Sequence, residues 1–138
     1  MRSLSTTLVA AVLALSFFYP GISLAGMNII TDAKLFRLEL ELEEPAQPVV
    51  GTNAVVLTVS DARSNQKIDD ASIEAVPWMT MHGHGSSKKP SIKNMGSGRY
   101  QVENIYFTME GDWDLIITIE KKGVKDSAIF SISNVKIK

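Results

Sequence analysis

The stretch Phe36-Arg37-Leu38-Glu39-Leu40-Glu41-Leu42 decides the fold class of this chain. Apolar and charged side chains alternate along its whole length, which is the period of a β-strand with one buried face. The same alternation returns in five later stretches of the chain: 53–60, 72–78, 99–108, 112–119 and 128–132. No helical period follows Ala25, so the sequence predicts an all-β protein.

Turn residues separate the predicted strands at regular intervals. Pro45, Pro48 and Gly51 fall in the connection 43–52, and glycines mark the later turns at 110–111 and 121–123. Six or seven short strands with short connections predict an immunoglobulin-like antiparallel β-sandwich of about seven strands. Along 99–108 the alternation directs Tyr100 and Val102 inward, with Tyr106 as a further candidate.

The first 25 residues have the order of a secretory signal peptide. They run from a positive start through an apolar segment and a helix break to a small-residue cleavage site: Met1-Arg2, Leu8 to Phe18, Pro20-Gly21 and Ser23-Leu24-Ala25. The apolar segment is shorter than the about 20 residues that a membrane-spanning helix needs. We therefore predict a signal peptide over 1–25 and one exported, extracytoplasmic or periplasmic domain over 26–138, without a membrane span after cleavage. An uncleaved N-terminal anchor is the alternative.

Composition excludes several classes of function. The chain has no cysteine, so thiolate metal sites and cysteine nucleophiles are ruled out. Lys and Arg number 14 against 15 Asp and Glu, which is not the basic balance of a nucleic-acid-binding protein. No nucleophile elbow, P-loop or HExxH motif occurs, and we expect no enzyme activity.

The chemically unusual stretch is Met79-Thr80-Met81-His82-Gly83-His84. It contains both histidines of the chain and two of its methionines. Thioether sulfur binds Cu(I) well and hard cations poorly, and imidazole binds copper in either oxidation state. The donors Met79, Met81, His82 and His84 therefore predict a copper site that favours Cu(I).

Strand geometry restricts how these donors meet. On a straight strand Met79 and Met81 share one face, while His82 and His84 share the other. All four converge only if the chain bends after Met81, where Gly83 permits it. Met95 and Met109 are the candidates to complete the site. The alternative is structural, with core methionines and solvated histidines, and Trp78 beside the cluster is expected in the core.

A second hypothesis involves no metal. Residues 83–98 are rich in glycine, serine and lysine and predict a long loop, and such loops are commonly functional. Lys88, Lys89 and Lys93 would let this loop dock on a membrane-protein partner. The chain would then be a β-sandwich interaction module acting as an accessory to a membrane-protein complex.

Three motifs carry a resemblance to a known family, namely Pro77 to Gly85, Gly98-Arg99-Tyr100 and Phe107 to Trp113. Together they resemble the YtkA-like/FixH-like group of small exported sandwich domains, although Thr80 stands where relatives often have proline. The resemblance implies an immunoglobulin-like sandwich outside the cytoplasmic membrane and a link to copper handling. Its implied roles are copper delivery or tolerance, with a membrane partner in oxidase assembly or metal export.

Overall fold

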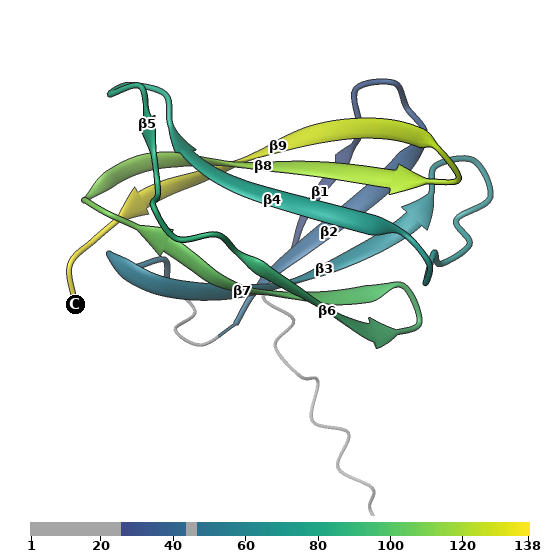
Figure 1. Cartoon of the computed structure of the whole chain (residues 1–138), viewed down its shortest axis with the longest axis horizontal. Coiled ribbons are helices and arrows are strands. Elements are labelled where there is room, and N and C mark those ends of the chain that lie inside the picture. Colours follow the sequence, from purple (N-terminus) through teal and green to yellow (C-terminus); the bar gives the residue numbers. More distant parts are fainter. Residues whose placement is uncertain (1–25, 44–46) are drawn as a thin grey trace, which may run out of the picture.

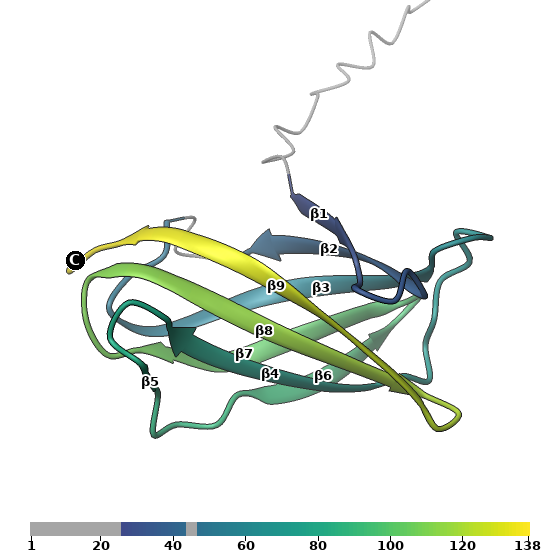
Figure 2. The same ribbon diagram turned by 90° about the horizontal axis from the view of Figure 1, so that it is seen from above.

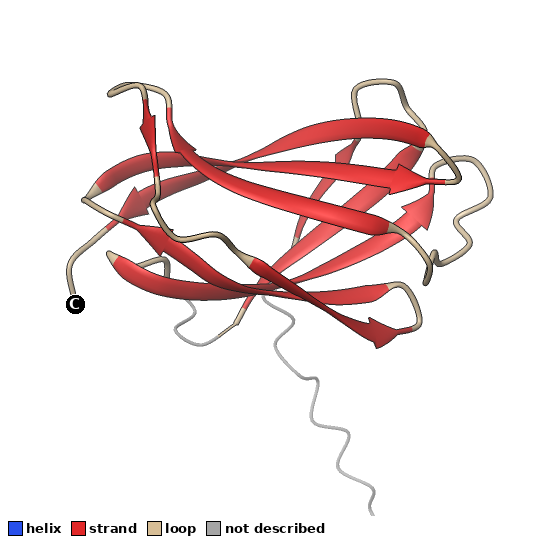
Figure 3. Cartoon of the chain, in the orientation of Figure 1, coloured by secondary structure: helices blue, strands red, loops and turns tan. Residues whose placement is uncertain are grey.

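The computed structural model describes residues 26–43 and 47–138, and the regular structure there consists of strands (Figure 3). The predicted signal peptide lies outside the described residues. Within them, no helix of a length and hydropathy suited to crossing a membrane is present. The strands are β1 (Met27–Ile30), β2 (Phe36–Leu42), β3 (Gly51–Asp61), β4 (Ser72–Met79), β5 (His84–Gly85), β6 (Ser91–Gly96), β7 (Arg99–Phe107), β8 (Gly111–Lys121) and β9 (Val124–Val135).

The strands form two antiparallel sheets that pack face to face (Figure 1). One sheet has the order β1-β2-β3-β7-β6 and the other has the order β5-β4-β8-β9. Inward-facing side chains of both sheets make one continuous core, because alternate residues of every long strand point between the layers. The predicted all-β sandwich is confirmed.

The described residues form nine strands where the sequence predicted about seven, and the difference lies in short edge strands. The stretch 83–98 is not one long loop, because it contains β5 and β6. In β6 only Ile92, opposite Val102 of β7, packs against the core. An edge strand with a single inward apolar residue lacks the alternation from which strands are predicted.

The alternation along β7 is interrupted after Val102. Asn104 has a φ of 59°, and the pairing with β3 shifts register between Asn53 and Val55. This bulge reverses the facing of the following residues, so that Ile105 is buried and Tyr106 is partly exposed. The inward placement predicted for Tyr106 is therefore wrong.

A buried carboxylate joins the two sheets at the end opposite the Met/His stretch. Asp126 of β9 accepts hydrogen bonds from Thr31 Oγ1, from Ala33 N at 2.9 Å and from Leu35 N at 3.2 Å, and its own sheet adds Ser127 N at 2.9 Å. Burial opposes ionisation, but these donors outweigh it and hold the pKa of Asp126 below its ordinary value.

We expect Asp126→Asn to lower the free energy of unfolding by about 1.5–3 kcal/mol at pH 7, the range for hydrogen bonds to a charged group. Because the folded-state pKa is depressed, ionised Asp126 stabilises the fold fully above about pH 4–5, and this contribution disappears as the pH falls through the folded-state pKa. Urea unfolding at pH 7 and pH 3 measures this. If wild type and variant lost the same amount of stability between pH 7 and pH 3, ionised Asp126 would not be the stabilising group.

Candidate metal centre

The Met/His stretch forms a tight hairpin between β4 and β5, at the end of the sandwich where β8 begins (Figure 1). Residues 80–83 make the turn. The carbonyl of Met79 accepts hydrogen bonds from Gly83 N at 2.8 Å and His82 N at 3.2 Å, and Gly83 takes a φ of 65°. Thr80 Oγ1 donates to Asp114 Oδ2 at 2.7 Å, which fastens the turn to β8. The hairpin therefore has a defined shape.

The chain bends directly after Met79, which changes which donors face each other. Met79 is opposite His84 in the antiparallel register, and directly opposed residues carry their side chains on the same face of a sheet. Met79 belongs to the core and is 2% exposed, so His84 also faces inward. On a straight strand Met79 would share its face with Met81. Because the chain turns directly after Met79 and not after Met81, Met79 shares its face with His84 instead.

A tryptophan of the core supports this inner pair. The His84 ring meets Trp113 edge-on, with ring centres 5.6 Å apart. Trp113 is itself fixed by packing on Phe107 at 5.2 Å and by a hydrogen bond from its Nε1 to the carbonyl oxygen of Met109 at 3.0 Å. The ring of His84 is therefore held between the turn and a buried indole.

The two histidine rings lie close enough to share one ion. Their centres are 6.0 Å apart. An imidazole nitrogen lies about 1.2 Å from its ring centre and bonds a metal at about 2.0 Å, so two rings on one ion have centres within about 6.4 Å. His84 Nδ1 lies 3.3 Å from the carbonyl oxygen of Gly85. When this contact is a hydrogen bond, Nδ1 is the donor, because a carbonyl only accepts, and Nε2 is the nitrogen left to bind a metal.

The thioethers differ sharply in exposure and position. Met81, at the tip of the turn, is 87% exposed, in contrast to the buried Met79. Met109 lies between β7 and β8 at the same end of the sandwich and is partly exposed. Met95 lies near the end of β6, beside the residues that pair with the start of β7, at the opposite end of the sandwich. The structure brings five of the six predicted donors to one end and leaves Met95 apart.

The environment of Trp78 differs from the prediction. The inward positions of β4 are Ala75, Pro77 and Met79, so Trp78 faces outward and is 37% exposed. The core tryptophan at the site is Trp113. The alternation along β8 predicts that it faces inward, but its contact with His84 joins residues far apart in sequence and could not be predicted from that pattern. Strand parity alone would have directed Trp78 to the surface.

The donor set at this end is soft. Within residues 26–43 and 47–138, no group of three or more histidine, aspartate or glutamate side chains is placed to hold a metal ion. The hairpin instead combines two imidazoles with two thioethers, and a third thioether lies nearby in Met109. Such donors fit copper, above all Cu(I), better than zinc, magnesium or calcium.

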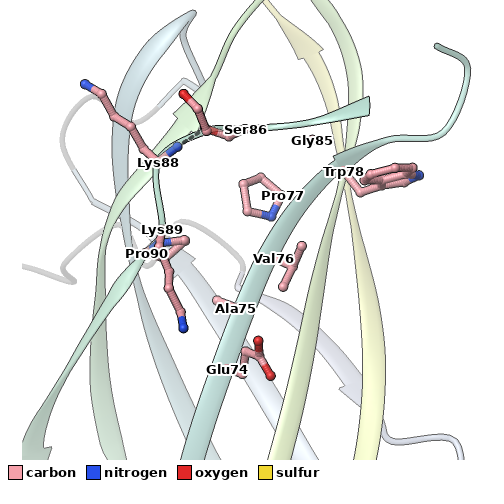
Figure 4. A pocket seen from close by; sticks show the side chains of 11 residues that line it. Glu74, Ala75, Val76, Pro77, Trp78, Gly85, Ser86, Lys88, Lys89 and Pro90 are labelled. Atoms are coloured by element: carbon pink, nitrogen blue, oxygen red, sulfur yellow. Dashed lines mark hydrogen bonds between the residues drawn. The ribbon is translucent and has the colours of Figure 1, made fainter. Parts of the chain in front are cut away.

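The lysine-bearing segment lies beside the hairpin. Residues 85–90 run alongside the free edge of β4 and enclose a groove of about 550 Å³ whose lining includes Trp78, Lys88 and Lys89 (Figure 4). Lys88 Nζ lies 4.2 Å above the ring of Tyr106. Lys93 lies outside this groove, on β6. The groove is separate from the Met/His donors.

Comparison with known proteins agrees with this architecture. The model of the YtkA-like family matches residues 32–118. The chain belongs to the YtkA-like family. No curated protein has a sequence that matches this YtkA-like chain.

Two solved structures, both of FetP from uropathogenic Escherichia coli strain F11, resemble this YtkA-like domain in fold. One is FetP as isolated after expression in the periplasm of E. coli, with a TM-score of 0.51, 11% identity and coverage of 80% of this chain and 94% of FetP. The other is a copper-bound variant of FetP with one glutamate replaced by glutamine, with a TM-score of 0.51, 10% identity and coverage of 83% and 92%. At this identity the likeness concerns the fold.

Proposed function

We propose that this YtkA-like protein is exported and binds Cu(I) through its Met/His hairpin, for copper delivery or tolerance. The observation that carries the proposal is the placement of His84 on the same inner face as Met79, with the ring of His82 6.0 Å away. Support also comes from FetP, which shares the fold and was expressed in the periplasm, and of which one variant has been seen with copper bound. The predicted signal peptide is consistent with export.

Each residue has a distinct part in the proposed site. Met79 and His84 are the inner ligands, because they are directly opposed and are held by the core and by Trp113. His82 and Met81 are the outer ligands, since they lie on the turn and reach solvent. Met109 is the candidate to complete the set, and Met95 is too far away. Copper bound here would be the protein's cargo, taken up and released at the exposed tip.

A metal-free interaction module is the second candidate. It is favoured by the groove beside β4, whose wall carries Lys88 and Lys89. In this case exchanging Lys88, Lys89 and Lys93 for glutamate would abolish association with a membrane-protein partner, and removal of metal would have no effect on that association.

A competition titration with a Cu(I) chelator of known affinity tests the copper proposal. We expect one Cu(I) per chain, and we expect Met81→Leu/His82→Gln to weaken the affinity by about 10–100-fold, the range seen when the surroundings of a metal are disturbed. Met95→Leu is the matched control and should leave the affinity unchanged. Absence of Cu(I) binding by the wild-type protein, or equal loss in the control, would reject this site.

A further inference from the structure

The β5-β4-β8-β9 sheet turns one of its faces outward, away from the other sheet (Figure 2). This outer face carries a row of apolar side chains. Val76 is opposite Ile116, and Ile116 is opposite Ile129, so the three side chains cross the sheet side by side. Val76 is 38% exposed and Ile129 is 51% exposed, and Trp78 extends the row toward the hairpin. Four large apolar side chains thus adjoin one another on a surface that faces water.

The outer face of the other sheet shows that the fold does not require such a row. There the register puts Glu39 beside Thr58 and Thr58 beside Arg99, so charged and polar side chains cross the strands. Single exposed apolar residues are ordinary, but a contiguous group with polar neighbours is typical of an interaction site. The apolar row therefore indicates a binding surface.

Carboxylates lie on both sides of the row. Glu74 precedes Val76 along β4, and Asp114, which is opposite Trp78 at the other end of the row, precedes Ile116 along the antiparallel β8. Next to Asp114 is a hollow of about 430 Å³. Besides Trp113, its lining consists of two carboxylates, three hydroxyls and one thioether: Asp112, Asp114, Thr80, Ser131, Ser133 and Met81. On the strands of this face the lysine is Lys125, which pairs with Glu120 at 3.4 Å. Lys88 and Lys89 lie beyond the free edge of β4, in the groove that borders Trp78, and Lys88 is directed to the ring of Tyr106 on the other sheet. The face therefore combines apolar surface with negative charge.

We propose that this face docks a partner protein whose own surface has an apolar strip flanked by arginine or lysine, one of which enters the hollow beside Met81. Apolar burial supplies affinity, and the carboxylates select a cationic partner and fix its register. Arginine suits the hollow best, because its planar donors match carboxylate oxygens.

Charge favours a basic protein partner over two other occupants of this face, namely a second copy of the chain and a membrane surface. A second copy of the chain would bring the same carboxylates to the interface, and its lysine on this face is engaged by Glu120. An anionic membrane surface would be repelled by Glu74, Asp112 and Asp114. A basic protein surface meets neither obstacle.

Docking here would place the partner against the proposed copper hairpin. Met81 lines the hollow and is an outer ligand of that hairpin, and Thr80 of the same turn is bonded to Asp114. The partner is therefore the protein that exchanges copper with this chain. This last step rests on the proposed copper function, whereas the docking itself does not.

Photo-cross-linking in the cells that produce the protein tests the docking. A photoreactive residue replaces Ile129 in the full-length chain, and the control carries it at Thr58 on the polar face. We expect a product from position 129 but not from position 58, joined to one protein through a segment that contains Arg or Lys. Glu74→Gln/Asp114→Asn should reduce that product at least about fivefold, because charge complementarity is lost.

Four results would overturn the proposal: no product above the position-58 control, a product with a second copy, a product with lipid, or a yield that the Glu74→Gln/Asp114→Asn change leaves unaltered. A parallel Cu(I) titration of the same variants keeps the two proposals apart. Cross-linking that persists in a protein that binds no copper would retain the docking face and reject the copper function. Copper binding without a cross-link would retain the copper function and reject the docking face.

Discussion

Replacing both inner donors, as Met79→Leu/His84→Gln, is expected to lower the Cu(I) affinity by more than about 100-fold while the protein stays folded. Disturbing groups behind a metal ligand already costs about 10–100-fold, and this change removes two proposed ligands that are opposed across one hairpin. Leucine keeps the volume and apolar character of the buried methionine, a change that usually costs less than about 1.5 kcal/mol. Competition titration and urea unfolding of the same samples measure both effects.

The control for this variant is Met109→Leu/Met95→Leu, which also changes two donors but leaves the hairpin intact. Its affinity should fall less than that of the inner-pair variant, with any loss traced to Met109 by testing the single changes. If removal of Met79 and His84 left the affinity within about twofold of wild type, the inner pair would not be a copper site. Met79 would then serve only to stabilise the core.

The long strands could be predicted because the alternation of apolar and polar side chains is a pattern of residues adjacent in sequence. Phe36–Leu42 was predicted with the bounds that β2 has, since one face is buried and the other is charged along its whole length. The bulge at Asn104 could not be predicted in the same way. It depends on a register shift against β3, which is a contact between distant parts of the chain.

The donor set of the candidate centre was predictable, but its arrangement was not. The residue types in 79–84 are sufficient to indicate soft-metal chemistry. Which donors oppose each other depends on where the turn begins. The hydrogen bonds from Gly83 and His82 to the Met79 carbonyl place it directly after Met79, two residues earlier than the bend expected after Met81. Met95 was included because it lay in the same predicted long loop, yet β6 runs away from the hairpin and carries Met95 to the other end of the sandwich.

Trp113→Ala is expected to lower the free energy of unfolding by about 3–5 kcal/mol, the range for truncating a buried aromatic residue. The side chain is 1% exposed and contacts Phe107 and His84, and its Nε1 binds the Met109 carbonyl. Truncation leaves a cavity among these groups and an unpaired carbonyl. It should also weaken Cu(I) binding, because the inner face of the His84 ring loses its support. Urea unfolding at pH 7 measures the stability.

The matched control is Trp78→Ala, since it removes the same side chain from the same sheet. Trp78 is 37% exposed, and one edge of its ring packs on Gly85 so closely that a Cβ atom at position 85 would lie 3.3 Å from Trp78 Cε3. Less surface is buried there, so the loss of stability should be well under half of that at Trp113. Equal losses at the two positions would mean that Trp113 is not the central packing residue. Trp113 would then not be the residue that holds His84 in place. The role of Met79 and His84 as inner copper ligands would lose this support.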